Sequence, residues 1–555
     1  MTTFDDLLEE AGEFGRCQKR IIAMMCLLPL LLGSAYASIV FQGFTPDHWC
    51  RDSVVVEMRQ ACNWSLAESR RLTVPLVNSS GALKQSSCEQ YKVNWNSTEL
   101  TCDTQELDLS ELPVTTCKDG WEYDYEGRKS FVTEFDLVCS EGWFVDMFQS
   151  IFNVGFLLGS FAFGFIADRF GRKLCFLVST LLNAIAGFGI AVAPNYITIL
   201  VFRAIVGFSA KGGFMSTYVL FTEIVGVKYR RTVGVTFEML FSVGVLIPLL
   251  SYFITDWRWL QVVMTAPYIL FLCYYWFIPE SPRWLISQKK FAKALEITEA
   301  IAKENKRKLK NSEALTEDEE ETSPPVSVLD LIRTPNIRKH TFILMFNWFI
   351  SSLVYQGLIM WVGITGGNVY IDFLISGLVE FPAAFLILLT IDRVGRRIPL
   401  AASNIIAGAS CLIAAAIPDS MFWFKTMVTC IGRLGITMAI QLVMFVNTEL
   451  YPTYIRNLAL SVCSTMCNVG GITAPFLLYR LAEIWLELPI LIFGVIAVLA
   501  GGLVFLLPET KGVPLPETID EIEFHNREKE DVVENQQMRK LLRSDLTNRK
   551  EPTTV

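Results

Sequence analysis

Six ionisable side chains lie inside long apolar stretches, where they could recognise a charged solute: Lys211, Glu238, Asp372, Glu380, Arg433 and Arg480. An ionised side chain at the centre of a membrane span costs about 2.5–3.5 kcal/mol on insertion scales, so such residues usually have a structural or functional role. The structural role is pairing between helices, which we favour for Glu380 and Arg433. The functional role is binding of a charged solute.

Catalysis is the less favoured chemistry. The three histidines, His48, His340 and His525, lie in unrelated regions, and the chain has no Gly-Lys-Ser/Thr loop to hold a nucleotide phosphate. We therefore predict no enzymatic activity, no cofactor and no metal site.

The elements that would hold these side chains are membrane-spanning helices. Of the 555 residues, 52% are apolar, and the mean hydropathy is +0.39. Windows of about 19 residues predict an all-α membrane protein with twelve spans, near 21–43, 146–167, 174–193, 196–217, 233–253, 259–278, 341–363, 369–391, 398–417, 423–446, 457–480 and 488–507.

A repeat divides these spans into two halves. Asp168-Arg169-Phe170-Gly171-Arg172 returns as Asp392-Arg393-Val394-Gly395-Arg396, 224 positions later. Pro279-Glu280-Ser281 returns as Pro508-Glu509-Thr510, and the pair Glu223/Arg230 returns as Glu449/Arg456. These repeats predict two pseudo-symmetric six-helix bundles and a transporter that alternates around a central site.

The repeated charges are expected to act as gates. Gly171 and Gly395 suit a tight turn that needs a left-handed conformation, and Asp168 and Asp392 could contact a helix amino terminus or an arginine. If such contacts form in only one state, neutralising Asp168 should change turnover more than apparent affinity. The expected gating residues are Asp168, Arg169, Arg172, Glu223, Arg230, Asp392, Arg393, Arg396, Glu449 and Arg456, with Arg203 in the same cytosolic network.

The distribution of cations predicts the topology. Lysine and arginine are concentrated in the connections between spans 2 and 3, 4 and 5, 8 and 9, and 10 and 11, which the positive-inside rule places in the cytosol. We therefore expect both termini to be cytosolic. The expected parts are an amino terminus (1–20), a first bundle (21–278) with an extracellular loop (44–145), a cytosolic linker (279–340), a second bundle (341–507) and a disordered cytosolic tail (508–555).

The loop over 44–145 is rich in cysteine and in glycosylation triplets. An even number of cysteines in an oxidising compartment predicts three disulfides, with 15 pairings that the sequence leaves open. The cysteines are Cys50, Cys62, Cys88, Cys102, Cys117 and Cys139, and the Asn-x-Ser/Thr acceptors are Asn63, Asn78 and Asn96.

The cytosolic segments carry two further patterns. Residues 291–310 are helical in pattern and basic, the acidic stretch 313–325 follows, and a short helix is expected near 326–333. The chain ends Thr553-Thr554-Val555, which matches PDZ-domain ligands, although a match of three residues also arises by chance.

Five longer motifs are GFTPDH (43–48), VTEFDLVC (132–139), ADRFGRKLC (167–175), YYWFIPESPRWL (274–285) and ELYPT (449–453). With these motifs the chain resembles the organic cation transporters of the solute carrier 22 group, within the major facilitator superfamily. The resemblance extends along the whole chain. It implies a plasma-membrane protein with a polyspecific cavity at mid-membrane, and the oxidised loop could support a homo-oligomer.

The resemblance also implies an aromatic substrate site. Ring faces attract cations by about 0.5–2 kcal/mol per contact without demanding one substrate shape. Trp348, Ser352 and Tyr355 share one helix face. The implied substrate-binding residues are Tyr36, Phe41, Lys211, Phe214, Glu238, Phe241, Trp348, Ser352, Tyr355, Ile440, Gln441, Cys467 and Asn468.

The chain departs from this group at two positions. Asn468 stands where organic cation transporters usually carry an aspartate, and Gln441 stands where glutamate is frequent. Glu238 could supply the missing negative charge, or it could be neutralised by Lys211. The first reading favours facilitative, potential-sensitive transport of small organic cations such as amines or quaternary ammonium compounds. The second favours zwitterions, neutral solutes or anions, and a non-transporting receptor or scaffold is the third alternative.

Overall fold

The computed structural model describes residues 4–79, 82–93, 95, 102, 112–124, 127–243, 246–307, 309, 329–362, 368–391 and 393–511. The chain forms two compact units. The first unit contains Met1–Ser312 and also Ile359–Gly377, and the second contains Glu313–Leu358 and Leu378–Val555. The end of the seventh predicted span and the start of the eighth therefore belong to the first unit.

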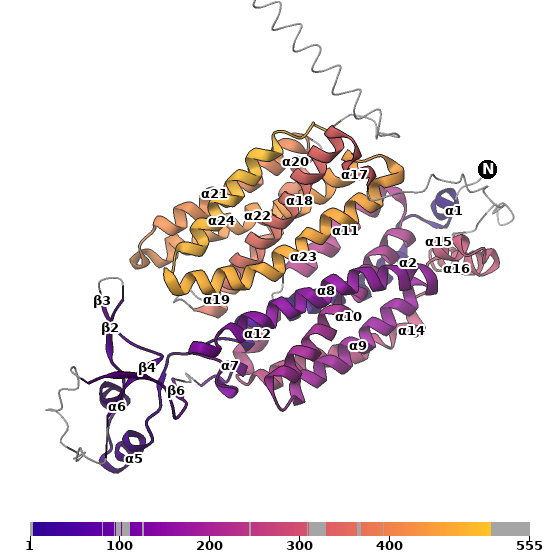
Figure 1. Cartoon of the computed structure of the whole chain (residues 1–555). Coiled ribbons are helices and arrows are strands. Elements are labelled where there is room, and N and C mark those ends of the chain that lie inside the picture. Colours follow the sequence, from indigo (N-terminus) through magenta and orange to yellow (C-terminus); the bar gives the residue numbers. More distant parts are fainter. Residues whose placement is uncertain are drawn as a thin grey trace, which may run out of the picture. The chain divides into compact units, whose positions relative to one another are not determined.

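The first unit is built around long apolar helices (Figure 1). α10 packs against both α8 and α9. A Cβ added to Gly155 on α8 would lie 2.1 Å from the Ala204 carbonyl oxygen of α10, so the absence of a side chain lets these backbones meet. The helices are α2 (Arg16–Met25), α3 (Leu27–Tyr36), α4 (Ile39–Gln42), α8 (Trp143–Phe170), α9 (Arg172–Val192), α10 (Tyr196–Ile224), α11 (Val227–Val243), α12 (Leu246–Phe253), α13 (Trp257–Phe271), α14 (Tyr274–Phe277) and most of α19 (Val369–Leu378).

The second unit is likewise built of packed long helices. α21 packs against both α22 and α24. Gly470 gives α23 a close approach to α18, since a Cβ there would lie 2.5 Å from the Phe349 carbonyl oxygen. The elements are α17 (Asp330–Arg333), α18 (Pro335–Trp361), α20 (Glu380–Thr390), α21 (Arg397–Ala416), η2 (Asp419–Met421), α22 (Phe422–Leu450), α23 (Thr453–Ile484) and α24 (Leu488–Val504).

Ten helices of the described chain are long and apolar enough to cross a membrane. They match ten of the twelve predicted spans. For the twelfth, α24 is apolar but has only 17 residues. For the fifth, α11 and α12 stand on either side of residues 244–245, which lie outside the described part. The total of twelve remains a prediction.

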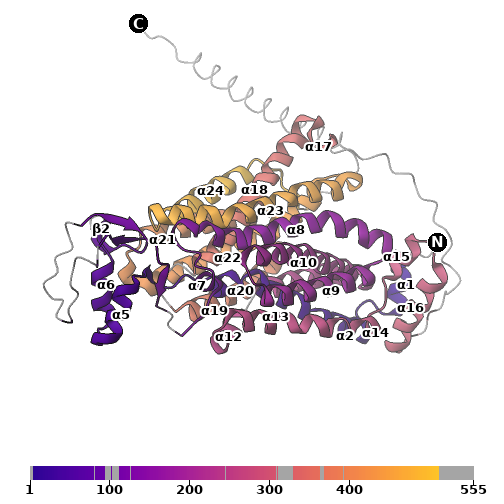
Figure 2. The same cartoon turned by 60° about the horizontal axis from the view of Figure 1, so that its bottom comes forward.

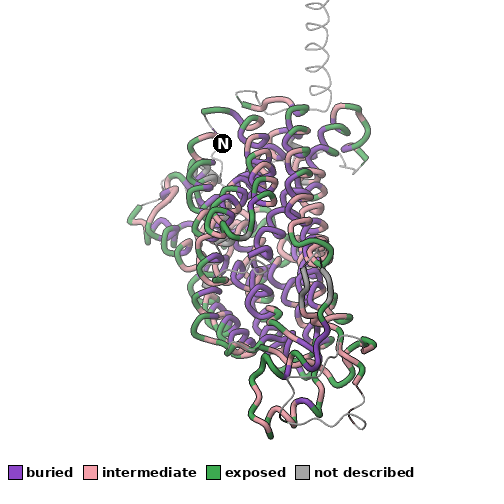
Figure 3. The backbone as a smooth tube through the Cα atoms, turned by 90° about the vertical axis from the view of Figure 1, so that its left-hand side faces the viewer, coloured by how far each residue is buried: buried purple, intermediate pink, exposed green. Residues whose placement is uncertain are grey.

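The exposed surfaces of these helices are apolar. Phe165 on α8 is 64% exposed and Trp276 on α14 is 75% exposed. Buried and exposed positions alternate along the helices (Figure 3). In a membrane protein, large exposed rings on helices of spanning length face lipid. Together with the ten apolar helices, these surfaces show that the chain is a multi-pass membrane protein.

The loop between the first two spans is not purely helical. Its described residues hold three two-stranded antiparallel sheets, which pair β1 (His48–Cys50) with β6 (Trp121–Tyr123), β2 (Leu76–Ser79) with β3 (Ala82–Gln85), and β4 (Glu89–Tyr91) with β5 (Val114–Thr116). Its helices are α5 (Ser53–Cys62), α6 (Leu66–Thr73), α7 (Phe131–Glu134) and η1 (Cys139–Glu141). The expectation of an all-α protein is thus correct for the spans and incomplete for this loop.

The six loop cysteines form the three expected disulfides. The pairs are Cys50–Cys117, Cys62–Cys102 and Cys88–Cys139. Among the predicted glycosylation acceptors, Asn63 is exposed at the end of α5. The side chain of Asn78 and the whole of Asn96 lie outside the described residues.

The amino terminus and the linker helices gather at the end of the first unit opposite the loop (Figures 1 and 2). Asn305 joins them, because its Nδ2 donates to the Ala11 carbonyl and to Gln18 Oε1 while its Oδ1 accepts from the Cys17 amide. The helices are α1 (Phe4–Ala11), α15 (Pro282–Ser287) and α16 (Phe291–Glu304). α16 confirms the predicted linker helix. The acidic stretch and the tail with Thr553-Thr554-Val555 lie outside the described residues.

Candidate transport site and gates

The first copy of the repeated motif forms a sharp turn between α8 and α9. Gly171 has φ of +104°, a conformation that favours glycine. The Arg172 guanidinium lies 3.1 Å from Glu223 Oε1 on α10 and 3.2 Å from Asp168 Oδ1. Of the two contacts expected for Asp168, the structure has the one with arginine. The motif thus forms contacts among α8, α9 and α10, which are three consecutive spans of the first unit.

The second copy repeats the turn between α20 and α21. Gly395 has φ of +108°. Arg396 Nε lies 2.9 Å from Glu449 Oε2 on α22, as Arg172 meets Glu223 in the first unit. Asp392 lies outside the described residues. The arginine–glutamate contact is therefore present in both units.

Two glutamates that were not predicted as gating residues complete these turns. Glu280 accepts backbone N–H bonds from Arg172 (2.9 Å) and Lys173 (3.1 Å), and Glu509 accepts them from Arg396 (2.9 Å) and Arg397 (3.2 Å). Each carboxylate stands at the positive amino terminus of a helix. The Pro-Glu-Ser/Thr repeat was visible in the sequence, but only the fold shows what it binds.

The remaining predicted gating arginines have different surroundings. Arg230 donates to the Thr222 and Val225 carbonyls at the end of α10, and Arg456 donates to the Tyr451 carbonyl after α22. Arginine at these positions satisfies carbonyls that a helix end leaves open. Arg169 lies over the rings of Phe165 and Phe170. Arg393 is exposed, and its carbonyl accepts a bond from Lys511.

The placement of Arg203 in the cytosolic network was wrong. Arg203 and Glu223 lie 20 residues apart on α10, which separates them by about 30 Å at 1.5 Å per residue. The Arg203 guanidinium is buried over the rings of Phe148 (4.2 Å) and Phe152 (4.5 Å) and donates to the Ala35 carbonyl.

Three predicted substrate-binding residues of the first unit share one aromatic cluster. The Tyr36 hydroxyl donates to Asn153 Oδ1, and its ring packs edge-on against Phe152. Lys211 Nζ lies 4.7 Å from the ring centroid of Phe156 and 5.6 Å from that of Phe214. Phe152 and Phe156 on α8 were not predicted, since phenylalanines are too common in the spans to single out. Asn153 on the same helix was also missed, because only the fold shows its contact with Tyr36.

Phe41 lies in a second aromatic cluster. Its ring centroid is 5.3 Å from that of Phe373 and 5.9 Å from that of Tyr370, both on α19. The side chains of Glu238 and Phe241 on α11 lie outside the described part of the chain.

In the second unit the predicted pairing of Glu380 with Arg433 is confirmed. Arg433 Nη2 lies 2.6 Å from Glu380 Oε1, and the two side chains are 2% and 1% exposed. The hydroxyl of Tyr355, a predicted substrate-binding residue, donates to the same Glu380 oxygen at 3.3 Å. Tyr355 is therefore part of a structural ion-pair network.

The other predicted residues of the second unit lie on three neighbouring helices. On α18, Trp348 and Ser352 are buried. On α22, Gln441 is buried and Ile440 is half-buried, and on α23, Asn468 is buried and Cys467 half-buried. Trp348 Nε1 and Gln441 Oε1 have no hydrogen-bond partner among the described residues. The predicted substrate-binding residues thus include one buried hydrogen-bond donor and one buried acceptor without a partner among the described residues.

Residues 120–522 match the family model described as "Sugar (and other) transporter". Solute carrier family 22 member 2 of Homo sapiens is 52% identical over 533 residues, which cover 95% of this chain and 96% of the relative. Solute carrier family 22 member 1 of Oryctolagus cuniculus is 51% identical over 94% of this chain and 96% of the relative, and member 3 of Mus musculus is 48% identical over the same shares. The chain belongs to the solute carrier 22 family.

The fold of this solute carrier 22 chain also matches that of a solved sugar transporter. An inward-open structure of the xylose transporter XylE from E. coli aligns with a TM-score of 0.58 at 17% identity, covering 90% of this chain and 98% of that one. The architecture is that of the major facilitator superfamily. Family and fold are those of solute transporters and not of enzymes.

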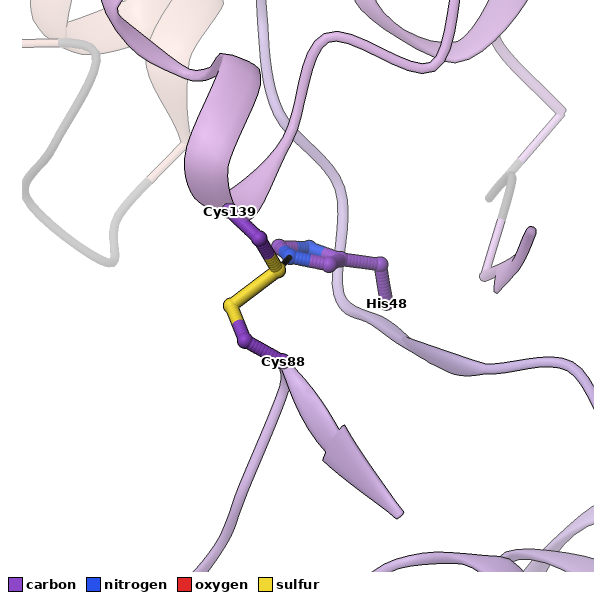
Figure 4. A group of neighbouring side chains, drawn as sticks. All are labelled: His48, Cys88 and Cys139. Atoms are coloured by element: carbon purple, nitrogen blue, oxygen red, sulfur yellow. Dashed lines mark hydrogen bonds between the residues drawn. A yellow bond between two sulfur atoms is a disulfide. The ribbon is translucent and has the colours of Figure 1, made fainter. Parts of the chain in front are cut away.

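One side-chain group in the loop of this solute carrier has the composition of a metal site. His48 lies against the Cys88–Cys139 disulfide, with its Nε2 3.9 Å from Cys139 Sγ (Figure 4). The two sulfurs are bonded to each other, and a metal-binding cysteine must be a free thiolate. Burial lowers the pKa of His48, and its ring packs against the disulfide as a structural group.

Proposed function

We propose that this chain carries small organic cations across the plasma membrane as a polyspecific, facilitative carrier that alternates between its two faces. The observation that carries the proposal is the match, over 94–95% of the chain, to solute carrier family 22 members 1, 2 and 3. Its motifs resemble the organic cation transporters of that family.

The aromatic cluster around Phe156 supports the same substrate class. The ammonium of Lys211 lies over the faces of Phe156 and Phe214, so these rings are oriented to receive a positive charge. An organic ammonium group would meet the same attraction at neighbouring ring faces. Disulfides and an exposed acceptor asparagine in the loop agree with an extracellular loop, a plasma-membrane location and cytosolic termini.

Uptake into proteoliposomes with a controlled membrane potential tests the proposal. A uniporter of monovalent cations gains about 2.3 kcal/mol per charge at 100 mV, which corresponds to about 50-fold accumulation. We expect labelled tetraethylammonium to accumulate with an inside-negative potential and to ignore an imposed pH gradient. Absence of potential-driven uptake of any ammonium compound would refute the proposal.

A second candidate is transport of zwitterions or neutral polar solutes. It is favoured by the uncharged Asn468 and by Gln441, whose buried Oε1 has no hydrogen-bond donor among the described residues. Uptake of a labelled zwitterion panel in the same liposomes separates the two candidates, because net-neutral solutes show no response to potential. The tail Thr553-Thr554-Val555 as a PDZ ligand and a homo-oligomer built through the loop remain proposals.

A further inference from the structure

We propose that the Cys88–Cys139 disulfide is a thiol-exchange site, opened by a low-molecular-weight thiol such as glutathione, and that His48 is the acid–base group that closes it again. In addition to packing against the sulfurs, the His48 ring then moves a proton. The inference goes beyond the proposed function, because it concerns the loop between the first two spans and holds for any transported solute.

The first observation is the position of the ring. His48 Nε2 lies 3.9 Å from Cys139 Sγ, and Figure 4 shows the imidazole ring beside this sulfur. His48, Cys88 and Cys139 are all half-buried, so a small solute can reach the disulfide. A histidine beside a cysteine lowers the pKa of the thiol by pairing the thiolate with an imidazolium.

The second observation is the tautomer of the ring. His48 Nδ1 lies 3.1 Å from the Pro46 carbonyl oxygen. A carbonyl only accepts hydrogen bonds, so Nδ1 carries the proton of the neutral ring, and Nε2 is the nitrogen that can accept a proton. The Ser87 carbonyl oxygen lies 3.7 Å from Cys139 Sγ, but it is too weak a base to take up a proton. The base at Cys139 is therefore His48.

The third observation is the set of charged and titratable groups around His48. Burial is the largest influence on the ring and lowers its pKa, and Arg70 of α6 acts in the same direction, whereas the backbone hydrogen bond and Asp47 raise it. Asp47 and Arg70 are paired with each other at 2.5 Å. On β6, the Tyr123 ring centroid lies 6.1 Å from that of His48, and the Tyr123 hydroxyl donates to Asp136. Burial thus favours the neutral ring, which is the form that accepts a proton.

The other two disulfides of the loop differ in this respect. His48 is the only histidine in the sequence of the loop, residues 44–145. The Cys62–Cys102 disulfide is also accessible, since Cys62 is half-buried and Cys102 is exposed. Accessibility alone would therefore make the two disulfides equally reactive, and only the base distinguishes Cys88–Cys139.

The exchange needs no reagent besides the thiol. In the opening step the glutathione thiolate attacks Cys88 Sγ, a bond forms between these two sulfurs, the Cys88–Cys139 bond breaks, and Cys139 Sγ keeps the electron pair and takes a proton from water. In the closing step Cys139 gives this proton to His48 Nε2. The Cys139 thiolate then attacks Cys88 Sγ, and glutathione leaves as a thiolate.

Opening this disulfide has a defined effect on the fold. Cys88 directly precedes β4, and Cys139 begins η1, which leads into α8. The disulfide is thus a covalent link between the β4–β5 sheet and the start of the second predicted span, and an external thiol would release it reversibly.

The test measures the closing rate of each disulfide in the purified full-length chain. Glutathione opens the disulfides, excess glutathione is removed, and closing is followed by acid quenching, alkylation and mass spectrometry. At about pH 7 we expect Cys88–Cys139 to close about threefold faster in wild type than in H48N, because the gain in thiolate outweighs its lower nucleophilicity. The two rates should converge at about pH 9.5, where a thiol ionises without a base.

The controls separate the base from the geometry. H48N keeps a side-chain donor for the Pro46 carbonyl but cannot take up a proton. E89Q is the matched control, since Glu89 is an exposed residue next to Cys88, and it should leave the closing rate unchanged. The closing rate of Cys62–Cys102 should be the same in all three proteins.

A second measurement decides the question if H48N does not fold. In wild type, the closing rate of Cys88–Cys139 should reach half of its maximum about one pH unit lower than that of Cys62–Cys102. Equal rates of wild type and a folded H48N at about pH 7, or identical pH profiles of the two disulfides, overturn the inference. A glutathione adduct on Cys139 instead of Cys88 also overturns it, as does a Cys88–Cys139 disulfide that stays intact while glutathione opens Cys62–Cys102.

Discussion

Glu380 and Arg433 illustrate how a charge is tolerated inside an apolar helix. Each side chain is almost fully buried, and Tyr355 supplies an additional donor to the carboxylate. Desolvation of both ions largely offsets their attraction, so the pair itself adds little free energy relative to apolar residues of the same size. The loss of one partner is different, because it leaves an uncompensated charge.

We predict that E380A lowers the free energy of unfolding by about 3 kcal/mol, since it leaves Arg433 buried without its partner. The double variant E380L/R433M should recover most of that loss. Thermal unfolding in detergent is the measurement, and E483Q, which breaks an exposed pair with Arg480, should change stability by less than about 1 kcal/mol. A double variant no more stable than E380A would contradict this account.

At the residue scale the sequence predicts which charges need partners, but it indicated the partners only for Glu380 and Arg433. Burial in an apolar stretch was enough to expect the Glu380–Arg433 pair. Arg203 was assigned to the cytosolic network of Glu223, but the length of α10 separates the two residues. Asp372 was noticed as a charge in a span, but its lack of a donor is visible only once its neighbours are placed.

At the element scale the two units use the same turn. In each unit a glycine at positive φ lies in the turn between two helices, and a distant glutamate binds the amides at the start of the second helix. Gly171 is both the C-cap of α8 and the N-cap of α9, whereas Gly395 precedes Arg396, the N-cap of α21. A Cβ on Gly171 would lie 2.4 Å from Glu280 Oε2, so the close approach of this carboxylate depends on the glycine. Through Glu280, the Pro-Glu-Ser segment after α14 thereby connects the end of the sixth predicted span to the start of the third by hydrogen bonds.

We predict that E280A destabilises the first unit by about 1–2 kcal/mol, the usual cost of losing a helix cap that also neutralises the helix dipole. E280Q should lose less, because its amide oxygen still accepts a backbone N–H. E509A should show the same loss through the second unit. The measurement is thermal unfolding in detergent. Equal stability of E280A, E280Q and wild type would show that the turn does not depend on this carboxylate.

Hydropathy is sufficient to predict most elements here. Ten of the predicted spans coincide with long apolar helices, since each must cross about 30 Å of hydrocarbon. The strands of the loop gave no comparable signal, because they are three or four residues long and held by disulfides. The cysteine pairing was likewise open, because 15 combinations satisfy the same sequence.

At the scale of the whole molecule the repeat means that each half of the transporter carries its own arginine–glutamate contact. Arg172–Glu223 and Arg396–Glu449 each join the third span of a half to its fourth. We propose that these contacts are more stable in one state of an alternating-access cycle than in the other. On that proposal, removing them shifts the balance between states and leaves the proposed substrate-binding residues in place.

We therefore predict that D168N and E223Q each lower the maximal uptake rate by about tenfold. This effect lies within the range of about 1–3 kcal/mol that is typical of coupling free energies. The KM of a labelled ammonium substrate should change by less than about twofold. E449Q should behave in the same way, because its half repeats the contact. Uptake kinetics normalised to surface protein measure both constants. E299Q is the control, since Glu299 is an exposed residue of the linker helix α16. A raised KM at an unchanged maximal rate would show that these carboxylates act in substrate binding. If the maximal rate fell only for the variants of one half, the two contacts would have different roles although their geometry is alike.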